Sequence, residues 1–451
     1  MNCGELLPKW VKRIGIVGVG RSNLSLLKML PRDTLYVIRS DGTVKRSLLP
    51  KWLRVEEIYE GERALADITE DALILSPSVR RDRPELASAM ARGVIVTSDS
   101  ELFFERVAAP VLAVSGSSGK STTATLAYEM LGGEAAGAVL SGNVGLPMVE
   151  TLSKDGRIYV CELSSFMLSY HKATLGRSVL TGITENHLDW HRDFEEYCRT
   201  KLSLFALSRE CVANVDDPIL GEYGRNRELF SAVSIKDSLG ELAARQRADI
   251  YMTLDRGWLC RNGERLLHVT ELKRQESYNI TNALCALALT DGLCDRRQAL
   301  SALRSFGGLE HRCEVVREAS GIRYINSSID TTPERCAVTL SSIKGRGVLL
   351  LGGRGKGLSY ECLVGGVSRF ARIVVAFGEE RENIYKAFCG SVTVEVCEKF
   401  RDAVACACAM ARSGESVVLS PANTSYDEFS SFEERGRLFC ELVREYAEEK
   451  S

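Results

Sequence analysis

Short apolar runs rich in β-branched residues alternate along this chain with segments of helical periodicity. Short runs of such residues, each followed by a helical pattern, are typical of buried parallel strands joined by helices. The pattern therefore predicts layered α/β domains built on parallel sheets. The clearest runs are Ile14–Gly18, Leu73–Leu75, Val94–Val96, Leu112–Val114 and Val348–Leu351.

Two interruptions divide this pattern into three parts. The segment Val107-Ala-Ala-Pro110 separates two α/β stretches, and Gly307-Gly308 interrupts the pattern a second time. We therefore expect three domains, over residues 1–108, 109–309 and 310–451.

One segment of the central part follows a different period. From Ala248 to Glu271, apolar and polar residues alternate around a turn at Asn262-Gly263. Alternation around an Asn-Gly pair is typical of a β-hairpin. We expect the central parallel sheet to carry a small antiparallel addition.

Composition and charge narrow the functional classes. The net charge is -2 with acidic and basic residues interspersed, which gives no electrostatic reason to expect nucleic acid or a membrane surface as partner. Fifteen cysteines are scattered without any Cys-x-x-Cys pair, often in apolar runs such as Val404–Met410, and are interpreted as reduced core residues. The N-terminus has no signal-peptide pattern, and no apolar stretch approaches the roughly 20 residues that span a bilayer. We expect a soluble, cytoplasmic enzyme that acts on small molecules.

The stretch Val111–Thr123 carries the strongest chemical signal. An apolar run opens through Gly116-Ser-Ser-Gly119-Lys120-Ser121-Thr122 into a helical pattern. Glycine amides and a helix N-terminus can approach phosphate oxygens, while the lysine and hydroxyl supply a cation and a magnesium ligand. Val114 stands where the general P-loop has a glycine, so the loop is a variant type. The spacing predicts a nucleoside triphosphate, bound by a P-loop ATPase-like central domain.

The first part opens with an incomplete dinucleotide motif. Gly18 and Gly20 match the first two glycines of that fingerprint, but Asn23 occupies the place of the third. A nicotinamide site also favours an acid at the end of the second strand, which here reads Ile38-Arg39-Ser40-Asp41. We expect a Rossmann-like domain holding a diphosphate, either a nicotinamide cofactor or, preferably, another diphosphate such as a nucleotide sugar.

Two polar clusters follow strands of the central part. Glu162 ends an apolar strand, where a carboxylate beside a phosphate loop can hold Mg²⁺ directly or through water. His187 lies in the segment Thr184–Asp189 after another strand, at the edge where parallel sheets bind ligands, although a structural role is the alternative for this histidine alone. Three other histidines lack such settings and are assigned surface or core roles: His171, His191 and His268.

Lys201 interrupts an apolar stripe on the helix predicted over Phe194–Leu207. Two explanations compete: the lysine stem is buried and its ammonium reaches water or an acid, or the amine is functional. Burial lowers a lysine pKa and favours the neutral amine, which reacts with carbon dioxide to form a carbamate, an anionic metal ligand. The other members of the stripe are Phe194, Tyr197, Cys198, Leu204 and Phe205.

In their order along the chain, these motifs resemble the Mur ligases, ATP-dependent amide-bond-forming enzymes of peptidoglycan synthesis. The resemblance covers essentially the whole chain. The sequences of the motifs are most similar to those of the branch that adds D-glutamate to UDP-N-acetylmuramoyl-L-alanine. The matching segments are Gly116–Thr122, Ser141–Pro147, Glu162–Phe166, Thr184–Asp189, Lys201, Asn279–Asn282, Gly308–Arg312, Gly352–Lys356, Ser420–Ser425, Ser425–Asp427 and Phe432–Gly436.

The resemblance implies a Rossmann-like uridine-nucleotide domain over 1–108, an ATP-binding catalytic domain over 109–309 and a Rossmann-like D-glutamate domain over 310–451. The reaction would pass through an acyl phosphate, with ATP, two magnesium ions and a carbamylated Lys201. The expected partners are the small-molecule substrates, without nucleic acid or membrane insertion, and the expected state is a monomer.

The site residues implied by the resemblance fall into four groups. The catalytic residues are Lys120, Glu162, His187 and Lys201, of which the last three, with Ser121, hold magnesium. The ATP site comprises Gly116, Ser117, Ser118, Gly119, Lys120, Ser121, Thr122, Asn279, Asn282 and Arg312. The UDP-substrate site comprises Gly20, Arg21, Ser22, Arg39, Ser76, Asn143 and Ser164. The amino-acid site comprises Thr331, Lys356, Ser425 and Phe432.

Four positions depart from the common family pattern. Ser327 replaces an acid and Ile329 a lysine, so neither the ribose contact nor one glutamate contact is available in its usual form. Arg354 replaces an acid beside the expected amino-acid site, where its charge would compensate for the absent lysine. Asn186 stands where an acid often precedes the histidine. The alternatives are a sister ligase for another amino acid, including L-glutamate, a silent nucleotide-binding regulator and a nicotinamide oxidoreductase.

Overall fold

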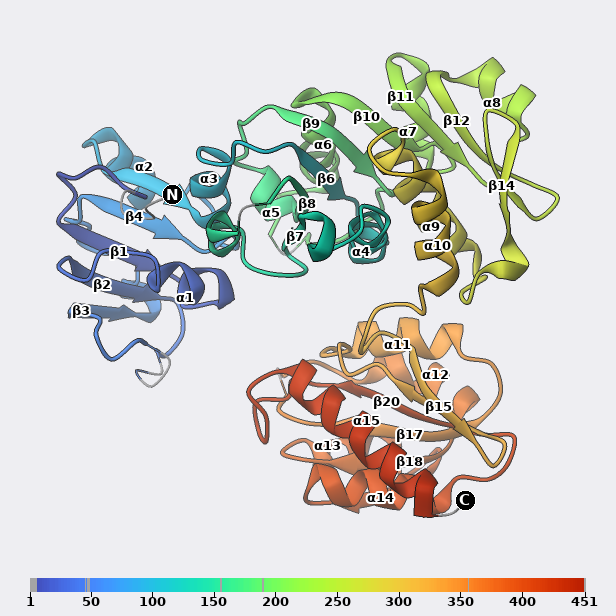
Figure 1. Ribbon diagram of the computed structural model, residues 1–451. Helices are drawn as coiled ribbons and strands as arrows, with labels where there is room; N and C mark the ends of the chain where they lie inside the picture. Colours follow the sequence, from blue (N-terminus) through green and yellow to red (C-terminus); the bar gives the residue numbers. More distant parts are fainter. Residues whose placement is uncertain are drawn as a thin grey trace. The chain divides into compact units, whose positions relative to one another are not determined.

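The computed structural model describes residues 6–44, 46, 49–154, 156–188, 190–355 and 357–449 (Figure 1). The chain forms two compact units, Met1–Phe306 and Gly307–Ser451. The first unit contains two sheets and the second contains one. No helix in the described residues is long and apolar enough to cross a bilayer.

The first sheet is entirely parallel, with strand order β3-β2-β1-β4-β5. Its central strands are apolar and buried on both faces because helices cover the sheet, as the N-terminal part of Figure 1 shows. The strands are β1 Arg13–Val17, β2 Leu35–Ser40, β3 Val55–Glu60, β4 Ala72–Leu75 and β5 Ile95–Ser98. The helices are α1 Arg21–Leu27, α2 Pro84–Ala91 and α3 Asp99–Phe104.

The second sheet has the order β14-β13-β12-β11-β10-β9-β6-β8-β7 and is parallel except for β12–β14. Positive φ angles at Asn262 (48°) and Gly263 (82°) close the β13–β14 hairpin, which confirms the predicted antiparallel addition. Its strands are β6 Val111–Ser115, β7 Ala138–Gly142, β8 Ile158–Glu162, β9 Leu175–Leu180, β10 Ser208–Asn214, β11 Glu228–Ser234, β12 Arg247–Asp255, β13 Trp258–Arg261 and β14 Glu264–His268.

Helices cover this second sheet and begin at several of its strand ends. Their bounds are α4 Lys120–Met130, α5 Ser165–Leu168, α6 Phe194–Ala206, α7 Pro218–Arg225, α8 Leu239–Arg245, α9 Ser277–Thr290 and α10 Arg296–Ser305. Helix α4 packs against both α9 and α10, so the helix that follows the phosphate loop has a rigid support.

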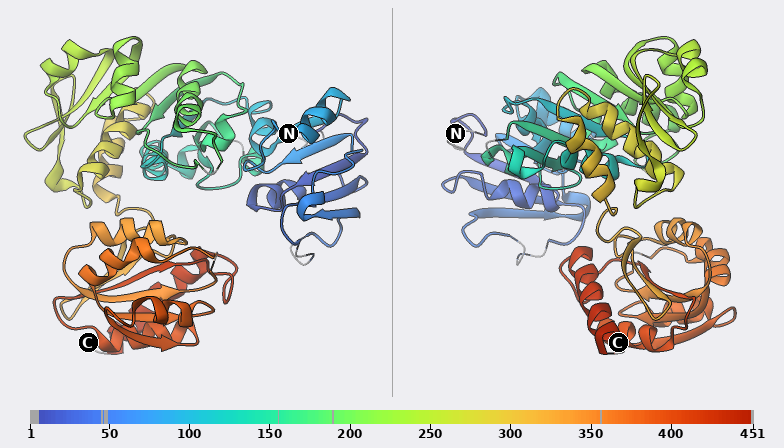
Figure 2. Two further views of the ribbon diagram at one scale, coloured as in Figure 1. Left: turned by 180° about the vertical axis from the view of Figure 1, so that it is seen from behind. Right: turned by 45° about the vertical axis from the view of Figure 1, so that its right-hand side comes forward.

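The second unit holds a sheet of order β15-β16-β20-β17-β18-β19, with only β15 antiparallel. Alternate residues of β17 enter different cores: Val348 and Leu350 pack with α14 and α15, whereas Leu349 and Leu351 pack with α11–α13. The views in Figure 2 show these helices on both faces of the sheet. The strands are β15 Glu314–Ala319, β16 Ile322–Asn326, β17 Gly347–Gly352, β18 Ala371–Phe377, β19 Thr393–Cys397 and β20 Ser416–Ala422. The helices are α11 Pro333–Ser342, α12 Val364–Phe370, α13 Arg381–Phe388, α14 Phe400–Met410 and α15 Phe432–Glu449.

The strands predicted from the apolar runs are confirmed, and so is the helix predicted over Phe194–Leu207. The two boundaries between the three expected domains stay predictions. The described cysteines are free thiols, but the expectation that they are core residues is wrong for Cys362 and Cys389, which are exposed on the second unit.

Candidate active site

The phosphate loop connects the end of β6 to the start of α4. Gly119 caps the helix with a φ of 79°, and a Cβ at this position would overlap the Asn282 carboxamide. Glycine is required here both for the left-handed backbone and for this close approach. Lys120 Nζ donates to the carbonyl of Ser117 at 2.8 Å, so the ammonium lies over the loop. The electropositive N-terminus of α4 and this ammonium suit a phosphate group.

The loop is tied to the neighbouring strand end at Thr184. Ser117 Oγ accepts from the Thr184 amide at 2.9 Å and lies 2.8 Å from the Tyr197 hydroxyl. These contacts join the phosphate loop, the segment of His187 and helix α6. The sequence predicted Ser117 from its motif and placed Thr184 in a polar cluster, but it assigned neither Thr184 nor Tyr197 a contact with the loop.

Glu162 ends β8 with a fully buried side chain. One carboxylate oxygen accepts from Asn143 Nδ2 at 2.9 Å. The other oxygen, Oε2, has no hydrogen-bond partner among the described residues. A buried carboxylate oxygen without a partner is costly, and a divalent cation would compensate that cost.

Lys201 lies on the inward face of α6 and is only 1% exposed, which confirms its place in the apolar stripe. Its Nζ donates to Ser115 Oγ at 3.0 Å, and Ser115 Oγ in turn donates to the Leu163 carbonyl at 2.6 Å. Burial lowers the pKa of Lys201 well below its usual value, and the nearby Lys120 charge lowers it further, while Glu162 opposes both. The environment therefore favours the neutral amine.

His187 occupies the turn after β9, with a φ of 54° and an exposed side chain. Its ring centroid lies 4.9 Å from that of Phe166, at the start of α5. Ser164 caps the same short helix by accepting from the Met167 amide at 3.2 Å. The ends of β8 and β9 thus bring together two segments that the sequence identified separately.

The described residues contain no cluster of three or more His, Cys, Asp or Glu side chains arranged to hold a metal. The residues near the phosphate loop fit a cation in a different way. They offer the hydroxyl of Ser121 and one carboxylate oxygen of Glu162 that has no hydrogen-bond partner among the described residues. Such a set suits a magnesium ion whose remaining ligands come from phosphate oxygens and water.

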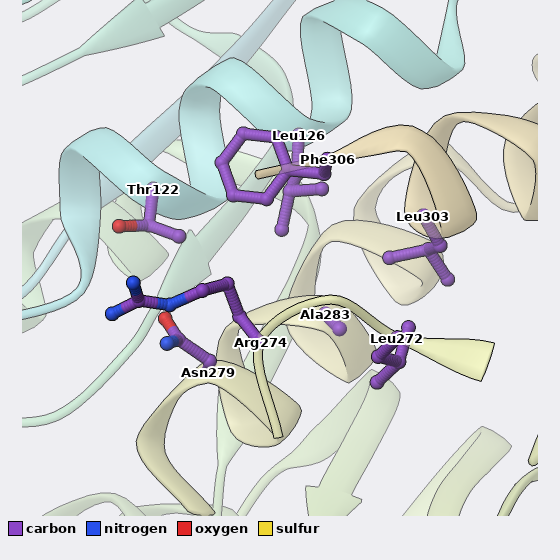
Figure 3. Close-up of a pocket in the computed structure, with 8 residues that line it drawn as sticks. All are labelled: Thr122, Leu126, Leu272, Arg274, Asn279, Ala283, Leu303 and Phe306. Atoms are coloured by element: carbon purple, nitrogen blue, oxygen red, sulfur yellow. The ribbon is translucent and has the colours of Figure 1, made fainter. Parts of the chain in front are cut away.

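A narrow cavity of about 10 Å³ lies between α4, α9 and α10 (Figure 3). In the figure, Thr122, Arg274 and Asn279 lie at one end and the apolar side chains at the other. Asn279 Nδ2 donates to Glu276 Oε2 at 2.9 Å. The sequence predicted Thr122 and Asn279, but it gave no signal for the remaining lining residues: Leu126, Leu272, Arg274, Ala283, Leu303 and Phe306.

A second cavity, of about 170 Å³, lies at the C-terminal edge of the first sheet. Gly20 caps α1, where Arg21 and Ser22 begin the helix, and the Arg21 side chain lies outside the described residues. The Asn23 side chain donates to the Gly18 carbonyl at 2.8 Å, so the residue that replaces the third glycine secures the turn. The cavity is lined by Val17, Gly18, Ser40, Asp41, Gly42, Leu65, Ser78, Val79 and Arg83.

Two residues predicted for the UDP substrate differ in their accessibility. Ser76 follows β4, and its Oγ lies 3.4 Å from Ser78 Oγ at the cavity. Arg39 is fully buried, with Nε 2.6 Å from Glu70 and its other nitrogens bonded to Glu70 and to the carbonyls of Ala64, Ala66 and Asp67. In this arrangement Arg39 supports the sheet edge from within, and no part of its guanidinium faces solvent.

The remaining predicted residues lie in the second unit. Thr331 follows β16, Ser425 follows β20 with its side chain buried, and Phe432 begins α15. The Phe432 carbonyl accepts from Ser328 Oγ at 2.8 Å, which joins two of these segments. Arg312 lies in the segment before β15. The predicted residue Lys356 lies outside the described residues.

Two residues of the second unit that depart from the family pattern, Ser327 and Arg354, have side-chain partners within that unit. Ser327 is buried, with its Oγ 3.3 Å from Thr339 Oγ1. Arg354 pairs with Glu379 at 2.6 Å, so its positive charge is already countered. The expectation that Arg354 compensates for the lysine absent at position 329 is therefore not supported by the geometry.

Comparisons with known proteins agree across the chain. Residues 114–290 match the Mur ligase middle domain, and residues 311–423 match the Mur ligase, glutamate ligase domain. Proteins named UDP-N-acetylmuramoylalanine–D-glutamate ligase are similar over nearly the full length. The protein from Clostridium botulinum is 32% identical, covering 96% of each chain, and that from Pseudomonas fluorescens is 33% identical, covering 96% of this chain and 98% of its own.

Solved structures share the fold at low sequence identity. A UDP-N-acetylmuramate–alanine ligase from Thermotoga maritima has a TM-score of 0.59 at 17% identity, covering 96% of this chain and 99% of its own. A pseudomurein peptide ligase from Methanothermus fervidus has a TM-score of 0.54 at 17% identity, covering 98% and 100%. With relatives above 30% identity over almost the whole chain, the family is established: this chain is a member of the Mur ligases.

Proposed function

We propose that this Mur ligase uses ATP to add D-glutamate to UDP-N-acetylmuramoyl-L-alanine in peptidoglycan precursor synthesis. One observation carries the proposal: a buried amine and an unpartnered carboxylate oxygen lie beside a phosphate loop in a chain whose full-length relatives bear that name. The nicotinamide alternative accounts for none of these features.

The chemistry divides one difficult condensation into two displacements. A carboxylate oxygen of the L-alanine unit attacks the γ-phosphorus of ATP, and ADP leaves with the bond electrons. The amine nitrogen of D-glutamate then attacks the acyl phosphate carbon, phosphate leaves and the amine loses a proton. Lys120 would neutralise charge on the transferring phosphoryl group, an electrostatic role that is usually large in phosphoryl transfer.

The residues near the loop would hold two magnesium ions. Ser121 and Glu162 would bind the ion shared with the ATP phosphates, while His187 and the carbamate of Lys201 would bind an ion near the acceptor carboxylate. Magnesium supplies positive charge to the phosphoryl oxygens during transfer. The unpartnered Oε2 of Glu162 supports the first assignment.

The environment of Lys201 supports the proposal that this lysine is carbamylated. The neutral amine attacks carbon dioxide, a C–N bond forms and one proton is released, leaving an anionic carbamate. The low pKa of the buried amine supplies the reactive form, and the Ser115 hydroxyl orients its nitrogen. The carbamate would place a second negative charge near the Glu162 carboxylate, and a bound cation would neutralise both charges.

Substrate binding would be divided among three domains with the boundaries predicted from the sequence, and the enzyme would act as a monomer in the cytoplasm. The first domain would hold the uridine nucleotide through Gly20, Arg21, Ser22 and Ser76, with Asn143 and Ser164 reaching the same substrate. The central domain would hold ATP through Gly116–Thr122, Asn279 and Asn282, with Arg312 approaching a phosphate. The third would hold D-glutamate through Thr331, Lys356, Ser425 and Phe432.

The proposal predicts a defined product. Purified protein with ATP, Mg²⁺, UDP-N-acetylmuramoyl-L-alanine and D-glutamate should convert the nucleotide substrate to a species heavier by one glutamyl residue, measured by mass spectrometry. Omission of ATP should abolish that conversion. A protein that binds ATP and leaves the nucleotide substrate unchanged with every amino acid tested would contradict the proposal.

A further inference from the structure

Arg80 joins three segments of the first unit. It follows β4, and its guanidinium donates to both carboxylate oxygens of Asp82, at 2.9 and 2.7 Å, and to Glu196 at 3.1 Å. It also donates to the carbonyl of Trp190 at 2.6 Å. A planar guanidinium can make these directed bonds simultaneously, which a lysine ammonium cannot. Arg80 therefore connects the segment after β4 with helix α6 and with the turn that contains His187.

The same arginine also fixes the ring of Trp190. The guanidinium carbon of Arg80 lies 4.8 Å from the Trp190 ring centroid, and the indole Nε1 donates to the Ser78 carbonyl at 2.6 Å. A cation over the ring and a hydrogen bond at its edge together define the ring orientation. Both contacts originate in the segment after β4.

Trp190 transmits this constraint to His187 by two routes. Through side chains, the Trp190 ring lies 4.8 Å from Phe166, whose ring lies 4.9 Å from that of His187. Through the backbone, the Trp190 amide donates to the His187 carbonyl at 3.1 Å. His187 has a φ of 54°, a conformation that non-glycine residues adopt only when their surroundings hold them there.

The carboxylates around Arg80 complete the connection. Arg192 Nη2 donates to Asp82 at 2.9 Å, and the Arg192 amide donates to Glu196 at 2.6 Å. Two arginines and two acids thus alternate between the segment after β4 and the start of α6. The charges are balanced within this group, so its function is structural connection rather than attraction of an anionic ligand.

We propose that Arg80 is a positioning residue for the ligation reaction. It fixes the turn at Trp190 and thereby presents His187 to the substrate held at the segment after β4. The inference rests on the proposed function, because that function assigns the nucleotide substrate to that segment and gives His187 a cation near the acceptor carboxylate. Loss of Arg80 should therefore affect use of the UDP substrate far more than binding of ATP.

The test compares Arg80→Met and Arg80→Lys with a matched control, Arg92→Met. Arg92 also lies in the first unit, and its side-chain hydrogen bonds to described residues, to Ser88 Oγ at 2.7 Å and to the Ile68 carbonyl at 3.0 Å, lie outside the site. Steady-state kinetics would give kcat/KM for UDP-N-acetylmuramoyl-L-alanine and KM for ATP. Hydrogen exchange of the Trp190 indole N–H, assigned with Trp190→Phe, would report the ring directly in the absence of turnover.

For Arg80→Met we expect kcat/KM for the UDP substrate to fall about tenfold or more, with KM for ATP within about twofold and faster indole exchange. Arg80→Lys should recover only part of this loss, and Arg92→Met should resemble the wild type. Unchanged indole exchange in Arg80→Met would overturn the inference, as would an equal loss for both substrates. A wild-type protein without ligase activity would instead refute the proposed function, while the exchange measurement would still test the positioning of Trp190.

Discussion

Replacing Arg39 separates a structural role from a substrate-binding role at this position. Arg39 and Glu70 form a fully buried ion pair, and the guanidinium also satisfies three backbone carbonyls. Arg39→Met would leave the Glu70 carboxylate buried without its partner. Breaking a buried pair in this way costs about 3–5 kcal/mol. The double variant Arg39→Met/Glu70→Leu removes both charges and should recover part of that loss, leaving a deficit of about 1–3 kcal/mol from the carbonyls that lose their donor.

Tryptophan fluorescence during urea unfolding would measure the free energy of unfolding of the wild type and of each variant. All four tryptophans belong to the first unit, and the Trp52 ring lies 6.4 Å from Tyr36 on the strand that carries Arg39. The KM for the UDP substrate would be measured on the double variant, under conditions where it is folded. We expect a KM close to that of the wild type. A loss of stability below about 1 kcal/mol in the single variant, or a tenfold higher KM in a stable double variant, would refute the structural role.

Three further predictions follow from the site and its surroundings. Lys120→Ala should lower ATP-dependent turnover at least roughly hundredfold because a strong electrostatic contact is lost; phosphate release near the wild-type rate would contradict this. Lys201→Ala should abolish ligation and regain part of it with added short carboxylates that replace the carbamate, whereas unaltered activity would make Lys201 purely structural. Burial lowers the pKa of His171 from 6.5 to about 4, so the unfolded chain binds the proton first and stability should fall by about 3 kcal/mol as the pH drops through that range. His171→Leu should remove this component of the pH dependence in urea titrations, and an identical pH profile would contradict it.

The sequence predicted the features that depend on local pattern. Apolar runs located the strands because parallel strands are buried on both faces, and the Asn262-Gly263 pair located the hairpin because its backbone requires positive φ. The inward place of Lys201 followed from helical spacing alone, since every third or fourth residue shares a helix face. These inferences needed no knowledge of distant contacts.

The features that the sequence did not reveal depend on pairing between distant segments. The sequence around Arg39 does not indicate that this residue forms an ion pair with Glu70. The sequence around Trp190 does not indicate that the Arg80 guanidinium lies over the Trp190 ring. Arg354 was expected to add free charge, but Glu379 on another loop balances it. The tertiary structure determines which charged side chains form ion pairs. The availability of a charged side chain to a ligand therefore cannot be predicted from its neighbours along the chain.

The most direct test of the central claim is phosphate release by the purified protein with ATP, Mg²⁺ and UDP-N-acetylmuramoyl-L-alanine, compared among D-glutamate, L-glutamate and no amino acid. We predict stimulation by D-glutamate and none by its enantiomer. Stimulation by L-glutamate or another amino acid would contradict the proposed specificity within the same family. No stimulation by any amino acid would contradict ligase activity itself and favour a nucleotide-binding protein without turnover.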